Sequence, residues 1–433
     1  MKKIFIIAVF AQLMFLQNAF GGTVDEFTLK NGIRVIFDKT DGPQVVSMRV
    51  FTPVSATSED RNLAGLSYFT SRLMTKSTLN RSNEVLANDI DNIGADISPD
   101  VDYDYASIAL SVLAQYFDKG VEILSDVIMN PAFDAKELEF EKQDAIAGLN
   151  SRKDSIGAVA SDKFTKLFYG NLAYSVPVTG SVESIKRITV DDMRKWHQYS
   201  YNASNMIIVV AGNIDKKIVK DSLNRHFANI ASGEKFVRPV LKAQEPSESV
   251  SRIKGKFNQA YIYMGFPAPT VHDKDFVTLK AAGAVLGGKM SSRLFVELRE
   301  KMGLAYDVNV VYPSRIGDSF FAIYIGLDKK NIDLTLKRIN EILKDFSENE
   351  VGAQELKDTK TYVSGIYALD RQTVGKLSYY YGLREIWGMG YEYDKQYIED
   401  FNKVSAKEIK DVADSVFKQK AITVIIDPAA SKK

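Results

Sequence analysis

Histidine and cysteine are the most common protein ligands for zinc, and this chain has few of either. Its three histidines are His197, His226 and His272, and no two of them lie three or four residues apart, the spacing that places two ligands on one helix face. Cysteine is absent, which excludes disulfide bonds, thiolate nucleophiles and cysteine-held iron–sulfur clusters. The sequence therefore argues against a self-contained zinc site.

The charge balance and the composition exclude several further classes of protein. Lysine and arginine together number 56 and aspartate and glutamate 55, so the formal net charge is +1 and nothing indicates binding to nucleic acid or to an anionic membrane. Of the 433 residues, 45% are hydrophobic and 26% are charged. This composition is that of a folded protein, and the length suits a chain of several domains at ~100–200 residues each.

The first residues have the features of a targeting segment. Lys2 and Lys3 precede an apolar run over residues 4–16, and Ala19 and Gly21 are small residues at the positions that a signal peptidase reads. We expect a cleaved signal peptide over residues 1–21, export, and a periplasmic location in a Gram-negative bacterium. The apolar run is shorter than the ~20 residues that span a bilayer, although an uncleaved anchor helix is the alternative.

A duplication with an offset of 215 residues organises the rest of the chain. Apolar residues at helical spacing over 117–128 recur over 332–343, and the apolar strand 207–210 recurs at 422–425. Each of these strands follows a predicted helix. Two coincidences at one offset indicate two homologous halves.

Each half combines strand and helix patterns. Alternating runs over 105–112 and 320–327 are typical of strands, and Asn31-Gly32 between two alternating runs predicts a tight hairpin turn at a sheet edge. We predict an α+β fold of two homologous domains, each a mainly antiparallel sheet with helices packed on one face.

The two predicted domains are an N-terminal domain over residues 22–231 and a C-terminal domain over residues 250–433. Residues 232–249 between them contain Pro239, Pro246 and several charged residues without a sustained period. Such a segment is typical of a linker.

Two segments carry a family resemblance: GLSYFTSRLMTKST over residues 65–78 and GGKMSSRLFVELREKMGLAY over residues 287–306. The first resembles the active-site helix of the pitrilysin/insulinase-like metallopeptidases, which include the mitochondrial processing peptidases and which carry a His-X-X-Glu-His motif there. The second is similar to that family's second-domain signature. The resemblance implies two α+β domains that form a clamshell and bind a peptide in extended conformation.

The first segment departs from the family at every zinc position. Tyr68 stands in place of the first histidine ligand, Ser71 in place of the catalytic glutamate and Arg72 in place of the second histidine. The third family ligand is a glutamate of a later helix, where this chain has Gly148, seven residues after Glu141. A guanidinium has no lone pair for zinc, and serine cannot replace a carboxylate as general base. We therefore expect that this chain binds no metal and no other cofactor.

The second segment keeps the two residues that matter for the family's chemistry. The resemblance implies that Arg299 and Tyr306 reach toward a zinc domain and contact the substrate backbone and the carbonyl under attack. Taken by themselves, Arg299 could pair with solvent or with Glu300 on a charged helix face, and Tyr306 could be an ordinary half-buried aromatic residue.

This contrast leaves three hypotheses for function. We favour a zinc-free, non-catalytic subunit of a heterodimeric pitrilysin-like peptidase, which lends Arg299 and Tyr306 to a homologous, zinc-bearing partner that hydrolyses an extended peptide. The alternative is a non-enzymatic peptide-binding or scaffolding protein with the same clamshell fold. An active peptidase with an unforeseen site is disfavoured, because no His-X-X-Glu-His motif or inverted variant occurs in the chain.

Overall fold

The computed structural model describes residues 24–243 and 250–428. The predicted signal peptide, residues 1–21, lies outside the described residues. None of the described helices is both long enough and apolar enough to cross a membrane.

The first half forms a six-stranded sheet with the order β1-β2-β6-β3-β5-β4. Its only parallel pair is β2 with β6. The strands are β1 (Val24–Thr28), β2 (Arg34–Lys39), β3 (Val45–Thr52), β4 (Asp96–Val101), β5 (Ala106–Leu113) and β6 (Ile207–Gly212).

The second half repeats this topology in a five-stranded sheet with the order β7-β11-β8-β10-β9, and its only parallel pair is β7 with β11. The strands are β7 (Val250–Gly255), β8 (Ala260–Ala268), β9 (Ala305–Val311), β10 (Ser319–Leu327) and β11 (Ile422–Pro428). Apart from β1, each strand has a counterpart whose start lies 209 to 216 residues later in the chain. The predicted duplication is therefore confirmed.

The helices follow the same repeat. Those of the first half are α2 (Leu66–Met74), α3 (Asn83–Asp91), α4 (Phe117–Met129), α5 (Ala135–Arg152), α6 (Ile156–Tyr169), α7 (Val182–Arg187), α8 (Val190–Ser200) and α9 (Lys216–His226). Those of the second half are α10 (Phe276–Leu286), the π-helix η5 (Phe295–Lys301), α11 (Ile332–Glu348), α12 (Ala353–Asp370), α13 (Val374–Ile386), α14 (Tyr393–Lys403) and α15 (Ala406–Phe417). Short 3₁₀ turns are η1 (Ala56–Ser58), η2 (Arg61–Leu63), η3 (Ala114–Tyr116), η4 (Ala173–Ser175) and η6 (Lys329–Asn331).

Local sequence sets several element ends. Thr189 begins α8 and Ser405 begins α15, and each forms a capping box with the acidic residue three positions later. The predicted hairpin joins β1 to β2, and Gly32 in its turn has a φ of +91°, which a residue with a side chain rarely adopts. The predicted hairpin at the edge of the sheet is confirmed.

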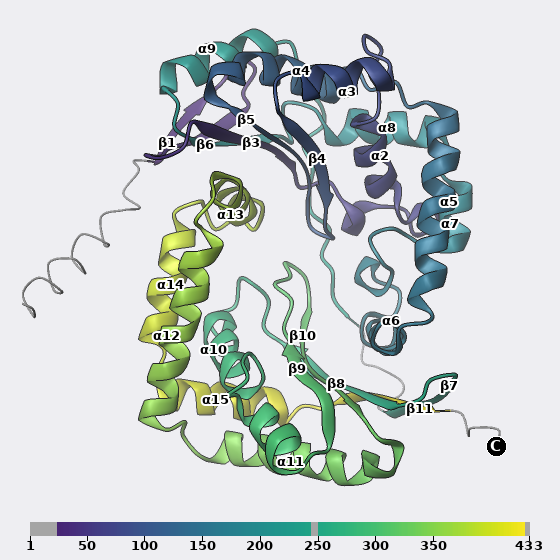
Figure 1. Cartoon of the computed structure of the whole chain (residues 1–433), viewed down its shortest axis with the longest axis vertical. Coiled ribbons are helices and arrows are strands. Elements are labelled where there is room, and N and C mark those ends of the chain that lie inside the picture. Colours follow the sequence, from purple (N-terminus) through teal and green to yellow (C-terminus); the bar gives the residue numbers. More distant parts are fainter. Residues whose placement is uncertain (1–23, 244–249, 429–433) are drawn as a thin grey trace, which may run out of the picture.

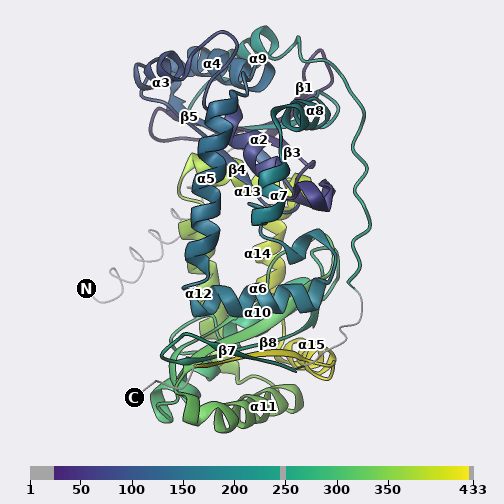
Figure 2. The same ribbon diagram turned by 90° about the vertical axis from the view of Figure 1, so that its right-hand side faces the viewer.

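The two halves exchange one helix each (Figure 1). Helix α13 of the second half packs on β3 and β6 of the first sheet, and α6 of the first half packs on β8 and β11 of the second sheet. The two helices are equivalent in the repeat, as are the strands that they cover. Helix α5 carries the chain from the level of the first sheet to α6, as Figure 2 shows, and its 18 residues span ~27 Å.

The predicted fold class is confirmed, and the structure adds the exchanged helices to it. The sequence placed helices on one face of each sheet, whereas the second face is covered by a helix of the other half. One hydrophobic core, built only from residues of the first half, lies on the outer side of the first sheet. Other residues of the first half, such as Phe51 and Tyr105, pack into the core of the second half. The boundaries of the two predicted domains stay a prediction.

The exchanged helices approach the sheets closely at two glycines. A Cβ at Gly382 of α13 would lie 2.0 Å from the ring of Phe51 on β3, and one at Gly265 of β8 would lie 2.4 Å from the ring of Phe164 on α6. Both positions therefore require glycine for packing.

We predict that Gly382→Ala destabilises the protein by about 1–3 kcal/mol, because the added methyl group must displace the Phe51 ring in a packed interface. The measurement is urea unfolding followed by circular dichroism. The matched control is Gly365→Ala, since a Cβ at this helical glycine of α12 meets nothing within 4 Å. It should be neutral or stabilising by up to ~1 kcal/mol. Equal effects of the two substitutions would contradict the helix exchange.

Candidate functional site

Helix α2 carries three of the four altered zinc positions, and its start is fixed by a carboxylate from outside the helix. Glu59 accepts hydrogen bonds from the backbone N–H groups of Gly65 (2.8 Å) and Ser67 (2.6 Å). These are among the N–H groups that lack partners at a helix start. Helix α5 packs against α2 and brings Glu141 beside it, so the structure assembles the positions that the resemblance singles out.

An ion pair fills the position where the family would bind zinc. Arg72 Nε lies 2.5 Å from Glu141 Oε2, and Lys76 Nζ lies 2.9 Å from Glu141 Oε1. Glu141 is only 2% exposed. Its burial by itself raises the pKa, but hydrogen bonds from Arg72 and Lys76 outweigh that effect and lower the pKa below its ordinary value. The carboxylate is therefore charged and doubly paired.

The other altered positions have structural surroundings. Ser71 is buried, and its hydroxyl lies 3.0 Å from the hydroxyl of Tyr201. The Arg72 guanidinium lies 5.4 Å from the centre of the Tyr68 ring. A Cβ at Gly148 would meet nothing within 4 Å, so the missing glutamate is not excluded by lack of space.

These residues do not fit a zinc ion. Two cations and one carboxylate occupy the position, and neither cation can donate a lone pair. Within residues 24–243 and 250–428, no group of three histidine, aspartate or glutamate side chains is placed to hold a metal.

Arg299 and Tyr306 lie in the second half, in a segment of unusual geometry. Arg299 belongs to the π-helix η5, a rare wide turn that often occurs at functional sites. It is exposed, and its guanidinium lies 4.9 Å from the centre of the Phe295 ring. Tyr306 lies near the start of the edge strand β9 and is 61% exposed, not half-buried. Among the described residues, neither side chain forms a hydrogen bond or an ion pair with α2 or α5.

The run of three tyrosines on α13, residues 379–381, serves packing between the two halves. Tyr381 donates a hydrogen bond to Asp38 Oδ2 on β2 (3.1 Å), and the hydroxyl of Tyr379 lies 3.1 Å from that of Tyr105. Gly287 ends α10 where a Cβ would lie 2.9 Å from the backbone nitrogen of Val310, so this glycine permits a tight connection.

Comparison with known proteins places the fold and the altered site in a family. A family model described as "Insulinase (Peptidase family M16)" matches residues 34–180, and one described as "Peptidase M16 inactive domain" matches residues 187–363. The chain belongs to peptidase family M16. Family membership together with the altered donor set supports a non-catalytic, peptidase-like protein.

Relatives with similar sequences span nearly the whole M16 chain. It is 24% identical over 408 residues to a Bacillus subtilis protein named "Uncharacterized zinc protease YmxG", covering 94% of this chain and 99% of that one. It is 26% identical over 402 residues to an uncharacterized zinc protease of Rickettsia felis, covering 92% and 96%.

Solved structures share the fold. An M16 inactive-domain structure from Pseudomonas fluorescens superposes with a TM-score of 0.87 at 20% identity, covering 95% of this chain and 99% of that one. A protease from Helicobacter pylori superposes with a TM-score of 0.86 at 20% identity, covering 94% and 100%.

Restoring the missing ligands should restore zinc binding. We predict that the fourfold variant Tyr68→His, Ser71→Glu, Arg72→His, Gly148→Glu binds about one zinc per chain, because a catalytic zinc needs three protein ligands. Elemental analysis after dialysis measures the content. The control with only Tyr68→His and Arg72→His should bind much more weakly. If the unaltered protein retains one zinc per chain, the interpretation of this site is wrong.

The Glu141 ion pair should make stability depend on pH. A carboxyl whose pKa is lowered on folding stabilises the protein above its unfolded pKa of ~4.5, and that contribution is lost as the pH falls through the folded pKa. Glu141→Gln should therefore destabilise by about 1–3 kcal/mol at pH 7, a value discounted because Arg72 and Lys76 are each about one-third exposed. The difference from wild type should shrink at pH 3.5, measured by urea unfolding. Asp144→Asn, an exposed change on the same helix, should have little effect at either pH.

Proposed function

We propose that this chain is the zinc-free subunit of a heterodimeric M16 peptidase and that it lends Arg299 and Tyr306 to a homologous, zinc-bearing partner. The observation that carries this proposal is a contrast between the zinc position of the first half and the Arg/Tyr segment of the second half. On α2 the zinc position holds a closed ion pair, whereas Arg299 and Tyr306 are exposed. A Tyr hydroxyl that is 61% exposed on an edge strand is available to a second molecule.

The chemistry then divides between the two subunits. The partner's zinc would polarise the scissile carbonyl, and its glutamate would activate water. Tyr306 donates a hydrogen bond to the oxygen that becomes negative in the tetrahedral intermediate, and such a donor is worth roughly 3–4 kcal/mol of barrier. Arg299 offers a planar set of N–H donors to the carbonyl oxygens of the substrate backbone.

An extended peptide is the substrate class that this arrangement suits. Such a peptide can add a strand to an edge of a sheet in the partner's zinc domain, which gives affinity with little sequence selectivity. The predicted signal peptide adds a location to the proposal. The complex would work outside the cytoplasm, and in the periplasm if the source is a Gram-negative bacterium, so the partner must be exported as well.

The partner is expected to be an M16 chain that carries the His-X-X-Glu-His motif. Co-expression with such a homologue encoded beside this chain, followed by size-exclusion chromatography, tests the pairing. Failure to pair with any such homologue would favour the alternative function, a non-enzymatic peptide-binding or scaffolding protein with the same fold.

We predict that Tyr306→Phe lowers kcat of the reconstituted complex by about 10²-fold or more without weakening assembly, because it removes one donor and keeps the ring. Arg299→Ala should raise KM as well as lower kcat. Tyr116→Phe, at another exposed tyrosine, is the matched control and should leave both constants unchanged. Wild-type cleavage by both the Tyr306 and the Arg299 variants would refute the proposed mechanism.

A further inference from the structure

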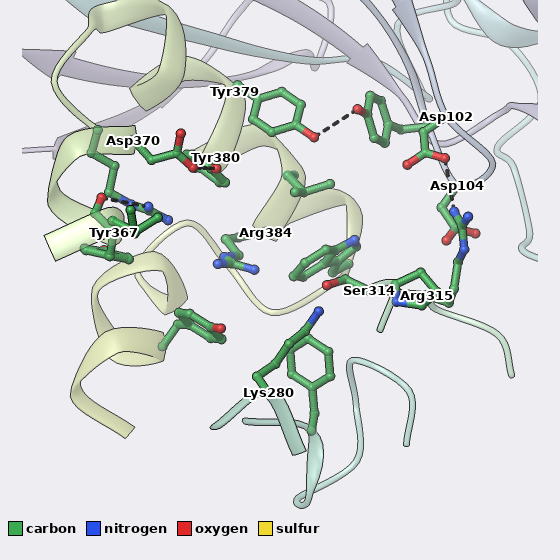
Figure 3. Close-up of a pocket in the computed structure, with 18 of the residues that line it drawn as sticks. Asp102, Asp104, Lys280, Ser314, Arg315, Tyr367, Asp370, Tyr379, Tyr380 and Arg384 are labelled. Carbon is green, nitrogen blue, oxygen red and sulfur yellow. Dashed lines mark hydrogen bonds and ion pairs between the residues drawn. The ribbon is translucent and has the colours of Figure 1, made fainter. Parts of the chain in front are cut away.

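A cavity of about 440 Å³ lies between the two halves (Figure 3). None of the residues of the altered zinc position lines it. Its walls come from α10, α12, α13 and α14 of the second half, from the turn between β9 and β10, and from the turn between β4 and β5 of the first half. Its volume is in the range of small-molecule binding sites, ~300–1,000 Å³.

One side of this cavity holds more positive than negative charge. Asp394 is 3% exposed and accepts hydrogen bonds from Arg371 at both carboxylate oxygens (2.6 Å each). Arg384 Nε also lies 3.3 Å from Asp394 Oδ1. A single carboxylate thus serves two buried guanidinium groups.

Lys280 adds a third cation. Its Nζ donates to the carbonyl oxygen of Tyr312 (2.6 Å) and lies 4.5 Å from the centre of that ring. Among the described residues, no carboxylate lies within ion-pair distance of this ammonium group. Figure 3 shows the Lys280 side chain pointing into the cavity and the Arg384 guanidinium near the middle of it. Burial, with Arg384 and Arg315 as further causes, lowers the pKa of Lys280 to about 7.

The other carboxylates of the cavity are engaged elsewhere. Asp102 pairs with Arg315 (3.0 Å), and Asp104 accepts from the Tyr174 hydroxyl (2.7 Å). Asp370 accepts from the Tyr380 hydroxyl and lies 3.6 Å from the exposed Lys376. Among the described residues, Asp394 is therefore the one carboxylate within ion-pair distance of Arg371 and Arg384, and Lys280 has none. A half-buried charge without an ionic partner is costly.

An apolar groove continues from this position. A second cavity of about 320 Å³ shares Lys280, Val363 and Ile366 with the first and is lined by further apolar residues such as Leu279 and Val310. Lys280 thus stands where a charged space meets an apolar one.

We propose that these adjoining cavities bind a small carboxylate with an apolar body, the carboxylate lying between Lys280 and Arg384 and the apolar part in the groove. A carboxylate accepts charge-assisted hydrogen bonds from both cations and supplies the missing negative charge. The terminal carboxylate of a peptide with an apolar last residue and the carboxylate of an alkanoic acid share this chemistry. The inference is independent of the proposed pairing with a zinc-bearing subunit.

Titration calorimetry on the full chain tests the proposal with three probes: N-acetylphenylalanine, its amide and octanoate. Both acids should bind, and the amide should bind at least 10-fold more weakly than its acid. The acid that binds more tightly shows which kind of ligand the site prefers: a peptide C-terminus if it is N-acetylphenylalanine, or an alkanoic acid if it is octanoate. If neither acid binds, if the amide binds as well as its acid, or if inorganic phosphate binds more tightly than both acids, the proposed ligand class is wrong.

Variants of Lys280 localise the binding. Lys280→Met should lower the affinity for the carboxylate about 10-fold or more and should remain folded, because it replaces a half-buried cation that has no ionic partner by an apolar chain of similar length. Thermal unfolding checks the fold. The matched control is Lys274→Met, at an exposed lysine just before α10, and it should bind as wild type does. Unchanged affinity in the folded Lys280→Met protein would overturn the proposal.

The pH dependence provides a further test. Binding to wild type should weaken above pH 7, by up to tenfold per pH unit, as Lys280 loses its proton, and Lys280→Arg should remove this dependence. The facing cations besides Lys280 are Arg315, Arg371 and Arg384. The facing acids are Asp102, Asp370 and Asp394 besides Asp104, whose pKa is raised by burial. Burial also raises the pKa of the facing tyrosines Tyr105, Tyr312, Tyr367, Tyr379, Tyr380 and Tyr397. A pH dependence that persists in Lys280→Arg would assign it to Asp104 and contradict the role of Lys280.

Discussion

The inner face of each sheet, opposite the helices of its own half, must be buried, and here a helix of the other half buries it. Helices α13 and α6 meet this constraint reciprocally, each at the end of a long helix that carries the chain across. The contacts of Gly382 with Phe51 and of Gly265 with Phe164 leave no room for a side chain, so they determine how closely each helix lies on its sheet. The relative position of the two halves follows from these two interfaces, and so does the cavity between them.

The same arrangement brings two equivalent turns into contact. The β4–β5 turn of the first half meets the β9–β10 turn of the second, where Asp102 pairs with Arg315 and Asp104 accepts a hydrogen bond from the backbone of Ile316. Tyr103 supports this contact, because the Arg315 guanidinium lies 4.2 Å from the centre of its ring. This pairing of equivalent helices and turns gives the two halves a common hydrophobic interior.

The charged and polar groups discussed above are of two kinds: those already paired within the protein, and those that are exposed or lack a partner. In the Arg72–Glu141–Lys76 group on α2 and α5, the one carboxylate is paired with both cations, so it is not free to bind a metal and contributes to stability instead. Arg299 and Tyr306 are exposed, and the Lys280–Arg384 side of the cavity has cations in excess. Polar groups of the second kind gain the most binding free energy from a ligand or partner, because the protein has not already supplied their hydrogen bonds or ion pairs.

The sequence alone determined the elements, the duplication and the loss of the zinc ligands, because each depends on residue type or on spacing within a short segment. The apolar periods over 117–128 and 332–343 predicted α4 and α11, and Asn31-Gly32 predicted the first hairpin. Only the tertiary structure decided that α6 and α13 cross to the opposite sheets, since a helical period shows that a face is buried but not what it is buried against. It also decided that Arg72 pairs with Glu141 and that Lys280 and Arg384 line one cavity. The two residues are 69 positions apart in the first case and about a hundred in the second, and such arrangements depend on how helices pack rather than on any local pattern.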